Sequence, residues 1–290
     1  MAVDGGRAAA LTTEAFTGRP QAMQHSALLN VMIAAARKAA RAIKRDFGEL
    51  EKLQVSLKSP ANFVTAADRR AEETIYAELM KARPGYGFLG EESGRREGTD
   101  TSHMWIVDPL DGTTNFLHGI PHFAISVALE RDGAVVAGLI YNPVTDEMFM
   151  AEKGKGAFLN DQRIRVAART RLAEAIVACG IAHHGHGDAG LWQKEIGAVQ
   201  EHVAGVRRFG AAALDLAWIA AGRLDGYWER TLKPWDLAAG LVLVREAGGF
   251  VTDCDGLDEM LNKGHIVAGN ERIHKGLLSL LKTAGKDQTS

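Results

Sequence analysis

Apolar residues recur every three or four positions in the first strongly patterned segment of the chain. Residues 26–47 therefore predict an amphipathic helix. A second helix is expected over residues 68–83, because Pro84 and Gly85 would end it. Between these two helices, residues 54–57 favour a short strand.

Strand patterns dominate the next part of the chain. The apolar runs 87–90 and 105–107 predict strands, and the polar stretch 93–102 between them predicts a mobile surface loop. Three further strands are expected to form an antiparallel meander joined by Gly- and Pro-containing turns. They cover residues 123–130, 135–141 and 147–152.

Helical and strand patterns alternate in the rest of the chain. The expected helices cover residues 188–203, 211–221, 234–247 and 270–283. The expected strands cover residues 176–179, 206–209, 224–229, 249–252 and 265–268. This order predicts a mixed α/β fold with two packed halves, residues 23–165 and 166–290, and a boundary within 155–175.

Residues 1–22 stand apart from this pattern. They are rich in Ala, Gly and Thr, carry no strong period and lack the apolar core of a signal peptide. Met23 directly precedes the first helical pattern. Two explanations stay open, a disordered extension or an upstream start codon that is not used, and a targeting segment is the weaker alternative.

Composition narrows the class of protein. The 290 residues are 46% apolar and 24% charged, with a net charge of −2, so a nucleic-acid-binding role is not expected. No stretch approaches the roughly 18 apolar residues of a membrane span. Cys179 and Cys254 lack the spacing of a zinc site. A disulfide between them stays open, but a reducing compartment fits, and a cytoplasmic location is expected.

The strongest chemical signal is the stretch Trp-Ile-Val-Asp-Pro-Leu-Asp-Gly-Thr-Thr-Asn-Phe, residues 105–116. Pro109 keeps Asp108 extended at the end of the predicted strand, Gly112 permits a close backbone approach, and Thr113 or Thr114 is expected to cap a short helix. Two carboxylates at such a turn favour a hard divalent cation, and free N–H groups at a helix start favour a phosphate oxygen. The alternative is an ordinary aspartate-rich turn.

Other carboxylates extend this pattern. Glu91 and Glu92 follow a predicted strand, and Glu229 precedes Asp236 by seven residues. Asp236 opens a predicted helix, where the helix dipole alone favours an aspartate. Thr65 and Asp68 have the spacing of a capping box, so a purely structural role stays open there as well.

Two other signals carry less weight. The run His183-His184-Gly185-His186 is interpreted as a solvated loop, although its histidines are typical metal ligands. The stretch 152–156 contains Gly and Lys but lacks the full phosphate-loop pattern, so a hairpin turn is expected.

Taken together, these segments resemble the inositol monophosphatase family of Mg²⁺-dependent, lithium-sensitive phosphatases. Residues 108–116 match its first signature and residues 235–240 its second, while 64–68 and 90–93 match two further metal-site segments in order. The resemblance covers about residues 25–282. It implies a layered α/β/α/β/α sandwich of the sugar-phosphatase type and a homodimer.

The resemblance also implies roles for individual residues and two to three Mg²⁺ ions per site. The implied metal ligands are Glu91, Asp108, the Leu110 carbonyl, Asp111 and Asp236. The implied catalytic residues are Glu91 and Thr113, which would orient the attacking water, and Asp68, which would bond to Thr113 or to metal-bound water. The implied substrate-binding residues are Asp111, Gly112, Thr113, Gly210, Ala211, Ala212, Glu229 and Asp236.

The substrate implied by the resemblance is inositol 1-phosphate or a similar small polyol phosphate. Fructose 1,6-bisphosphate, 3′-phosphoadenosine 5′-phosphate and histidinol phosphate stay open, since the whole superfamily shares these signatures. Ala211 stands where relatives often have Ser or Thr, which puts substrate choice in doubt. A different class of function is association with RNA polymerase, because some bacterial members bind the transcription machinery.

Overall fold

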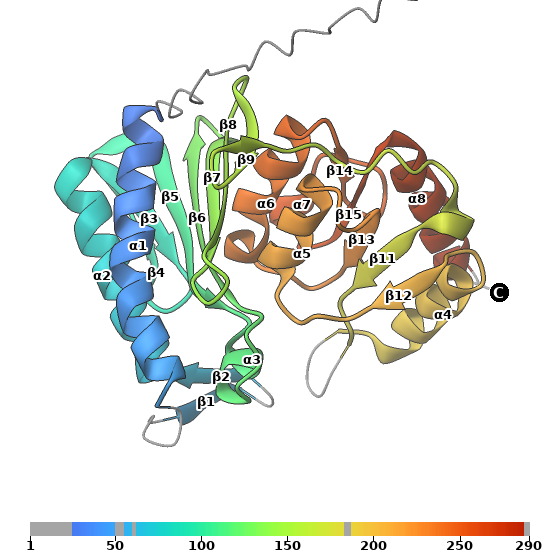
Figure 1. Cartoon of the computed structure of the whole chain (residues 1–290), viewed down its shortest axis with the longest axis horizontal. Helices are drawn as coiled ribbons and strands as arrows, with labels where there is room; N and C mark the ends of the chain where they lie inside the picture. The colour runs from blue at the N-terminus through green and yellow to red at the C-terminus, as the bar shows by residue number, and fades with distance from the viewer. Residues whose placement is uncertain (1–24, 50–54, 60–61, 183–186, 287–290) are drawn as a thin grey trace, which may run out of the picture.

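The computed structural model describes residues 25–49, 55–59, 62–182 and 187–286, and it is built in five layers (Figure 1). Two helices cover a large sheet, two further helices separate that sheet from a smaller one, and two more cover the smaller sheet. The family resemblance implied this α/β/α/β/α sandwich, and the structure confirms it. Residues 1–22 and the histidine run 183–186 lie outside the described residues.

The first layer consists of α1 (Ala27–Phe47) and α2 (Ala66–Ala82). Ser26 caps α1, since its hydroxyl oxygen accepts the Leu29 N–H at 3.1 Å. The apolar face predicted for α1 is buried against the large sheet. The helix α2 begins two residues before the expected position and places Asp68 in its first turn.

Eight strands form the large sheet, in the order β10-β9-β8-β7-β6-β5-β3-β4. In chain order, the first four strands of this sheet are β3 (Tyr86–Gly90), β4 (Gly94–Arg96), β5 (Asp100–Asp111) and β6 (Ala124–Arg131). The others are β7 (Ala134–Asn142), β8 (Glu147–Glu152), β9 (Gly156–Leu159) and β10 (Gln162–Arg163). The predicted meander is confirmed, and β8 and β9 form the hairpin expected at 152–156. A separate hairpin joins β1 (Val55–Ser59) and β2 (Asn62–Thr65).

The prediction of a loop over residues 93–102 is wrong. After a turn at Gly94, where φ is +71°, residues 94–96 pair with β3 as the edge strand β4. The strand β5 then begins at Asp100, five residues before the apolar run that signalled it. These polar residues form strands because their backbone pairs with the edge of an existing sheet. The local amino-acid composition does not reveal such pairing, so the sequence pattern predicted a loop.

The middle layer consists of α5 (Ala212–Ala220) and α6 (Pro234–Glu246). Both helices are apolar around most of their circumference, which is typical of a helix buried on all sides. They pack on the large sheet on one face and on the small sheet on the other (Figure 1). Residues from both halves of the chain therefore share this central core.

The smaller sheet has the strand order β12-β11-β13-β15-β14. Its strands are β11 (Ile176–Cys179), β12 (Gly205–Arg207), β13 (Gly226–Glu229), β14 (Phe250–Thr252) and β15 (Ile266–Gly269). The helices α4 (Ala189–Gln200) and α8 (Glu271–Lys286) cover its outer face. All the elements expected beyond residue 175 are present, with bounds that differ by a few residues. Among the described residues, α3 (Thr113–Leu117) is the short helix expected after Gly112, whereas a 3₁₀ helix (Leu172–Glu174) and α7 (Met260–Lys263) were not predicted.

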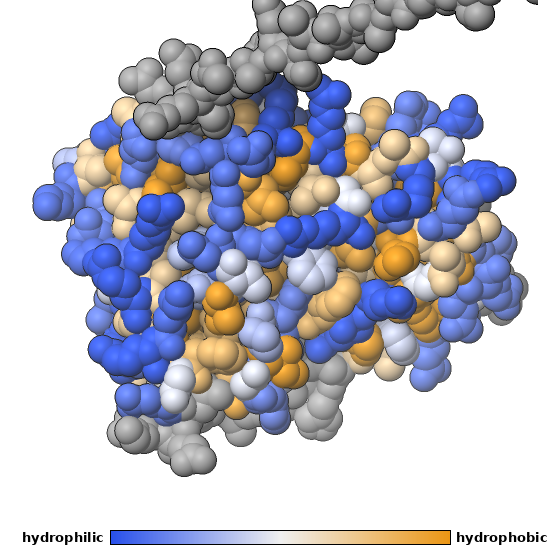
Figure 2. Space-filling view, in the orientation of Figure 1, coloured by the Kyte–Doolittle hydropathy of each residue, from blue (hydrophilic) through white to orange (hydrophobic). Residues whose placement is uncertain are grey.

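The surface mixes polar and apolar side chains on the face seen in Figure 2. In the described part of the chain, no helix is both long enough and apolar enough to cross a membrane. Cys179 and Cys254 are both buried and free, so the disulfide left open by the sequence does not form in this structure.

Close packing of α6 on β7 generates a testable prediction. A Cβ added at Gly138 of β7 would lie 2.6 Å from the Ala239 carbonyl oxygen of α6. Gly138→Ala is expected to destabilise the protein by about 1–3 kcal/mol, because backbone atoms must move apart. Thermal unfolding would measure this loss. The control is Gly197→Ala in α4, where a Cβ meets open space; equal melting temperatures for both variants would contradict the packing.

Candidate active site

Two aspartates lie at the carboxyl end of β5, in the layer between the two sheets. The pairing of β5 with β6 shifts register between Asp108, which pairs with Ser126, and Asp111, which pairs with Ala124. Asp108 is 2% exposed, and its Oδ1 accepts the Leu110 N–H at 2.8 Å. Gly112 follows with φ +91° and starts α3, so glycine rather than threonine occupies the cap position.

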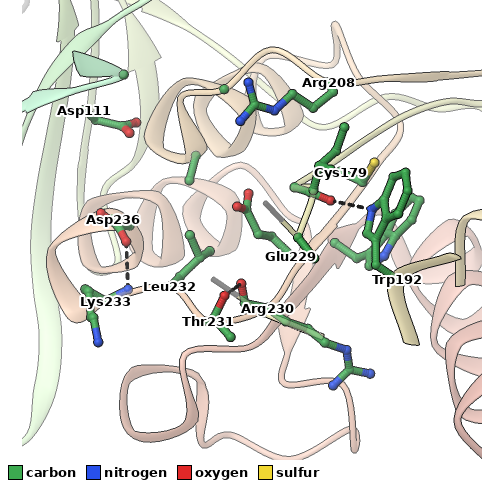
Figure 3. Close-up of a pocket in the computed structure, with 18 of the residues that line it drawn as sticks. Asp111, Cys179, Trp192, Arg208, Glu229, Arg230, Thr231, Leu232, Lys233 and Asp236 are labelled. Atoms are coloured by element: carbon green, nitrogen blue, oxygen red, sulfur yellow. Dashed lines mark hydrogen bonds between the residues drawn. The ribbon is translucent and has the colours of Figure 1, made fainter. Parts of the chain in front are cut away.

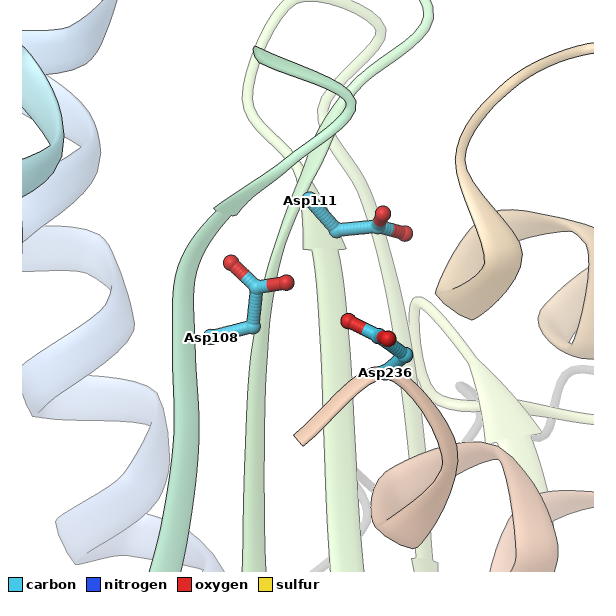
Figure 4. A group of neighbouring side chains, drawn as sticks. All are labelled: Asp108, Asp111 and Asp236. Atoms are coloured by element: carbon cyan, nitrogen blue, oxygen red, sulfur yellow. The ribbon is translucent and has the colours of Figure 1, made fainter. Parts of the chain in front are cut away.

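Asp236 reaches the same place from the first turn of α6. Its Oδ2 accepts the Lys233 N–H at 2.7 Å, which confirms the capping geometry expected at a helix start. Capping does not exclude a second role. One carboxylate oxygen each from Asp108, Asp111 and Asp236 lie within 4.8 Å of one another (Figure 4).

Negative charge is concentrated in this cluster. Burial, followed by repulsion from Glu91 and Asp111, raises the pKa of Asp108 well above its usual range. Burial and the Asp236 carboxylate raise the pKa of Asp111 in the same direction. Burial also raises the pKa of Asp236 to about 7. Carboxylates that repel one another in a buried site are stabilised by a cation, and an all-oxygen donor set suits a hard divalent ion.

Thr113 connects this cluster to α2. Its Oγ1 lies 3.0 Å from Asp68 Oδ1 and 3.1 Å from the Leu110 carbonyl oxygen, so the hydroxyl donates to one of these acceptors at a time. The expectation that Thr113 or Thr114 caps α3 is wrong, because Gly112 is the cap residue and the Thr113 side chain points back to α2. The capping box of Thr65 with Asp68 remains a prediction, since the Thr65 side chain lies outside the described part.

Glu91 lies in the turn between β3 and β4 and lines the same pocket as the aspartates. It is not one of the three mutually close carboxylates, but its charge raises the pKa of Asp108 and of Asp236. The pocket has a volume of about 370 Å³, and it opens between the two sheets (Figure 3). It also contains Glu229 and the backbone of Gly112 and Gly210.

The amino end of α5 closes one side of the pocket. Asp111 Oδ2 accepts the Ala213 N–H at 2.7 Å, which ties β5 to this helix. The Asn115 amide donates to the carbonyl oxygens of His122 and Phe209, both at 2.8 Å. Three implied substrate-binding residues, Gly210, Ala211 and Ala212, are therefore fixed beside Gly112, whose added Cβ would lie 3.2 Å from Ala211 Cβ.

Glu229 faces the aspartates from the end of β13. The Tyr227 hydroxyl donates to Glu229 Oε2, and burial raises the pKa of Glu229 to about 7. Gly180 leaves the space that this side chain occupies, because an added Cβ would lie 1.9 Å from Glu229 Cδ. Arg208 points into the same space as Asp111 and Glu229 (Figure 3).

One further residue of the site, Glu72 of α2, was not predicted from the sequence and is 4% exposed. Its two carboxylate oxygens accept the N–H groups of Glu92 and Ser93 at 2.8 and 2.9 Å. The available signal was its position four residues after Asp68, on the same face of a helix.

The raised pKa of Glu229 predicts a pH dependence of stability. The folded protein retains this proton up to about pH 7, whereas the unfolded chain releases it near 4.5, so the free energy of unfolding falls as the pH rises between these values. In EDTA, Glu229→Gln is therefore expected to raise the melting temperature relative to the native protein, and to do so more at pH 8 than at pH 5.

Thermal unfolding at the two pH values measures this difference. Glu201→Gln, a substitution at an exposed position at the end of α4, serves as the control and should give the same small shift at both. An effect of Glu229→Gln that does not grow with pH would show that the carboxyl group is ionised throughout.

Comparison with known proteins agrees with this geometry. Residues 24–286 match the model of the inositol monophosphatase family. The chain is 60% identical to the inositol-1-monophosphatase of Mesorhizobium japonicum, over 90% of this chain and 98% of that protein. It is 44% identical to the Nus factor SuhB of Pseudomonas aeruginosa, over 88% and 96% of the two chains.

A solved structure shares the same fold. The extragenic suppressor protein suhB from Bartonella henselae superposes with a TM-score of 0.86 and 57% sequence identity, covering 89% of this chain and 99% of that one. Five layers, the acidic cluster between the sheets and these matches agree: the chain belongs to the inositol monophosphatase family.

Proposed function

We propose that the protein is a Mg²⁺-dependent phosphatase that hydrolyses inositol 1-phosphate or a similar small polyol phosphate. The observation that carries this proposal is the convergence of Asp108, Asp111 and Asp236 beside the amino end of a helix. The 60% identity with a protein named inositol-1-monophosphatase supports the substrate class. The two halves inferred from the sequence, residues 23–165 and 166–290, each supply part of this site.

The metal-binding residues in this proposal are the carboxylates of the cluster. Asp108, Asp111 and Asp236 would hold one ion, while Glu91, Asp108 and the Leu110 carbonyl would hold another. A third, weaker ion would lie near Glu91. Bound Mg²⁺ supplies a deprotonated water near neutral pH and neutralises charge on the phosphoryl oxygens.

Thr113 and Asp68 would act on the attacking water. When the Thr113 hydroxyl donates to Asp68, its oxygen would still be able to accept a hydrogen bond from a water in the pocket that Thr113 lines. Glu91, in the turn between β3 and β4, would orient the same water. Because Asp68 is 1% exposed, bulk solvent does not compete with the Thr113 hydroxyl for the Asp68 carboxylate.

The substrate would lie between the two sheets. The N–H groups of Gly112 and Thr113 at the start of α3 suit phosphate oxygens. Glu229 and the backbone of residues 210–212 would contact the polyol, whose hydroxyls donate to carboxylates. Asp111 and Asp236, which line the same pocket, would also contact those hydroxyls.

Phosphate release from inositol 1-phosphate tests this function. We expect release that requires Mg²⁺, stops in EDTA and is inhibited by Li⁺. Asp111→Asn is expected to lower turnover more than about 100-fold, beyond the effect typical of residues that only support a metal ligand. The amide oxygen of the substituted side chain can still accept the Ala213 N–H, so the melting temperature should stay close to that of the native protein.

The control is Asp132→Asn, a substitution in the exposed β6–β7 turn, which should leave turnover unchanged. Release that persists in EDTA would exclude the metal-dependent mechanism. The protein could instead release no phosphate from inositol 1-phosphate but release it from fructose 1,6-bisphosphate, 3′-phosphoadenosine 5′-phosphate or histidinol phosphate. That result would keep the phosphatase activity and replace the proposed substrate.

In this proposal the protein would form a homodimer and would be located in the cytoplasm. The buried free thiols of Cys179 and Cys254 suit a reducing compartment. Sedimentation of the purified chain would measure the oligomeric state directly.

A second candidate function is association with RNA polymerase. The observation that favours it is the 44% identity with a protein named Nus factor SuhB. Retention of the purified protein on immobilised RNA polymerase is the expected outcome. Retention without any phosphatase activity would make this binding the primary role, and no retention would remove the candidate.

A further inference from the structure

We propose that Glu72 is a positioning residue that holds Glu91 in place to bind metal. This inference rests on the metal site proposed above. Glu72 lies outside the aspartate cluster and is not among the residues that line the pocket. It acts on the turn that follows Glu91, through the main chain.

The contacts of Glu72 use both oxygens of its carboxylate. Glu92 N–H donates to Oε2 at 2.8 Å and Ser93 N–H donates to Oε1 at 2.9 Å. A carboxylate is an acceptor only, and bonds of N–H groups to it are about twice as strong as neutral ones. Since Glu72 is 4% exposed, water does not compete for these bonds.

The main chain on both sides of Glu91 is thereby fixed. The Glu91 N–H donates to the Val107 carbonyl oxygen at 3.2 Å, one residue before Asp108. The next two N–H groups along the chain donate to Glu72. Gly90 leaves the room for this arrangement, because an added Cβ would lie 2.4 Å from Glu72 Oε2.

Glu72 has a counterpart on the same helix. Asp68 and Glu72 are four residues apart, so their side chains leave the same face of α2 one turn apart. Asp68 accepts from Thr113, which follows the aspartates of β5, and Glu72 accepts from the turn that follows Glu91. One helix face therefore fixes two segments of the site that are distant in sequence.

Glu72→Gln isolates this role. The glutamine amide keeps the shape of the side chain but presents a donor to one of the two N–H groups. The matched control is Glu73→Gln, which removes the same charge from an exposed neighbour on α2. The first readout is Mg²⁺ and Mn²⁺ binding without substrate, by calorimetry on the full-length chain.

We expect Glu72→Gln to weaken metal binding by about 10- to 100-fold, the range typical when a partner of a metal ligand is lost. Glu73→Gln should bind as the native protein does. In the metal-free state, amide hydrogen exchange of residues 91–96 should accelerate in Glu72→Gln alone, while α2 keeps its protection. In phosphatase assays, saturating Mg²⁺ should restore most of the lost kcat.

A rescue variant covers the case in which Glu72→Gln does not fold. Glu72→Asp keeps both acceptors on a shorter side chain, so its metal affinity should lie between those of the native protein and the glutamine variant. Native-like metal affinity in either folded variant, even with faster exchange, would reduce Glu72 to a structural cap and overturn the inference. Absence of metal binding by the native protein would instead refute the metal site, and this inference with it.

Discussion

Repulsion among buried carboxylates is the constraint on which this structure depends. Asp108, Asp111 and Asp236 bring three carboxylates to within 4.8 Å of one another, and two of them, Asp108 and Asp111, are only 2% and 9% exposed. Apolar packing does not offset the electrostatic free energy of bringing these carboxylates together. A bound cation therefore explains the arrangement better than a structural role does. The five-layer fold keeps these carboxylates close together despite their repulsion. The carboxylates of the pocket come from the two sheets and from the helix layer between them.

The helix layer does much of this holding. The amino ends of α5 and α6 both meet the cluster, and their N–H groups bond to Asp111 and Asp236. Each aspartate thus has one oxygen engaged by a helix and keeps acceptor capacity for a ligand. The central core that anchors both helices contains residues from both halves of the chain. The packing that stabilises the fold therefore also positions the site.

Much of the fold and the acidic residues of the site could be predicted from local sequence. Helical periods and turn residues located α1, α6 and the strands of the meander, and strand ends located Asp108 and Glu91. The strand β4 and the bridge formed by Asn115 could not be predicted, because they depend on backbone partners that only the folded chain brings near. Glu72 was missed for the same reason, since its partners are two main-chain N–H groups about twenty residues away.

The one-turn separation of Asp68 and Glu72 also limits how this gene can change. Each residue of an α-helix advances by about 100°, so a single insertion between the two would swing one carboxylate to another side of α2. Substitutions at the exposed positions between them leave that phase intact. The exposed positions 69 and 70 can therefore change in residue type far more freely than the stretch 68–72 can change in length.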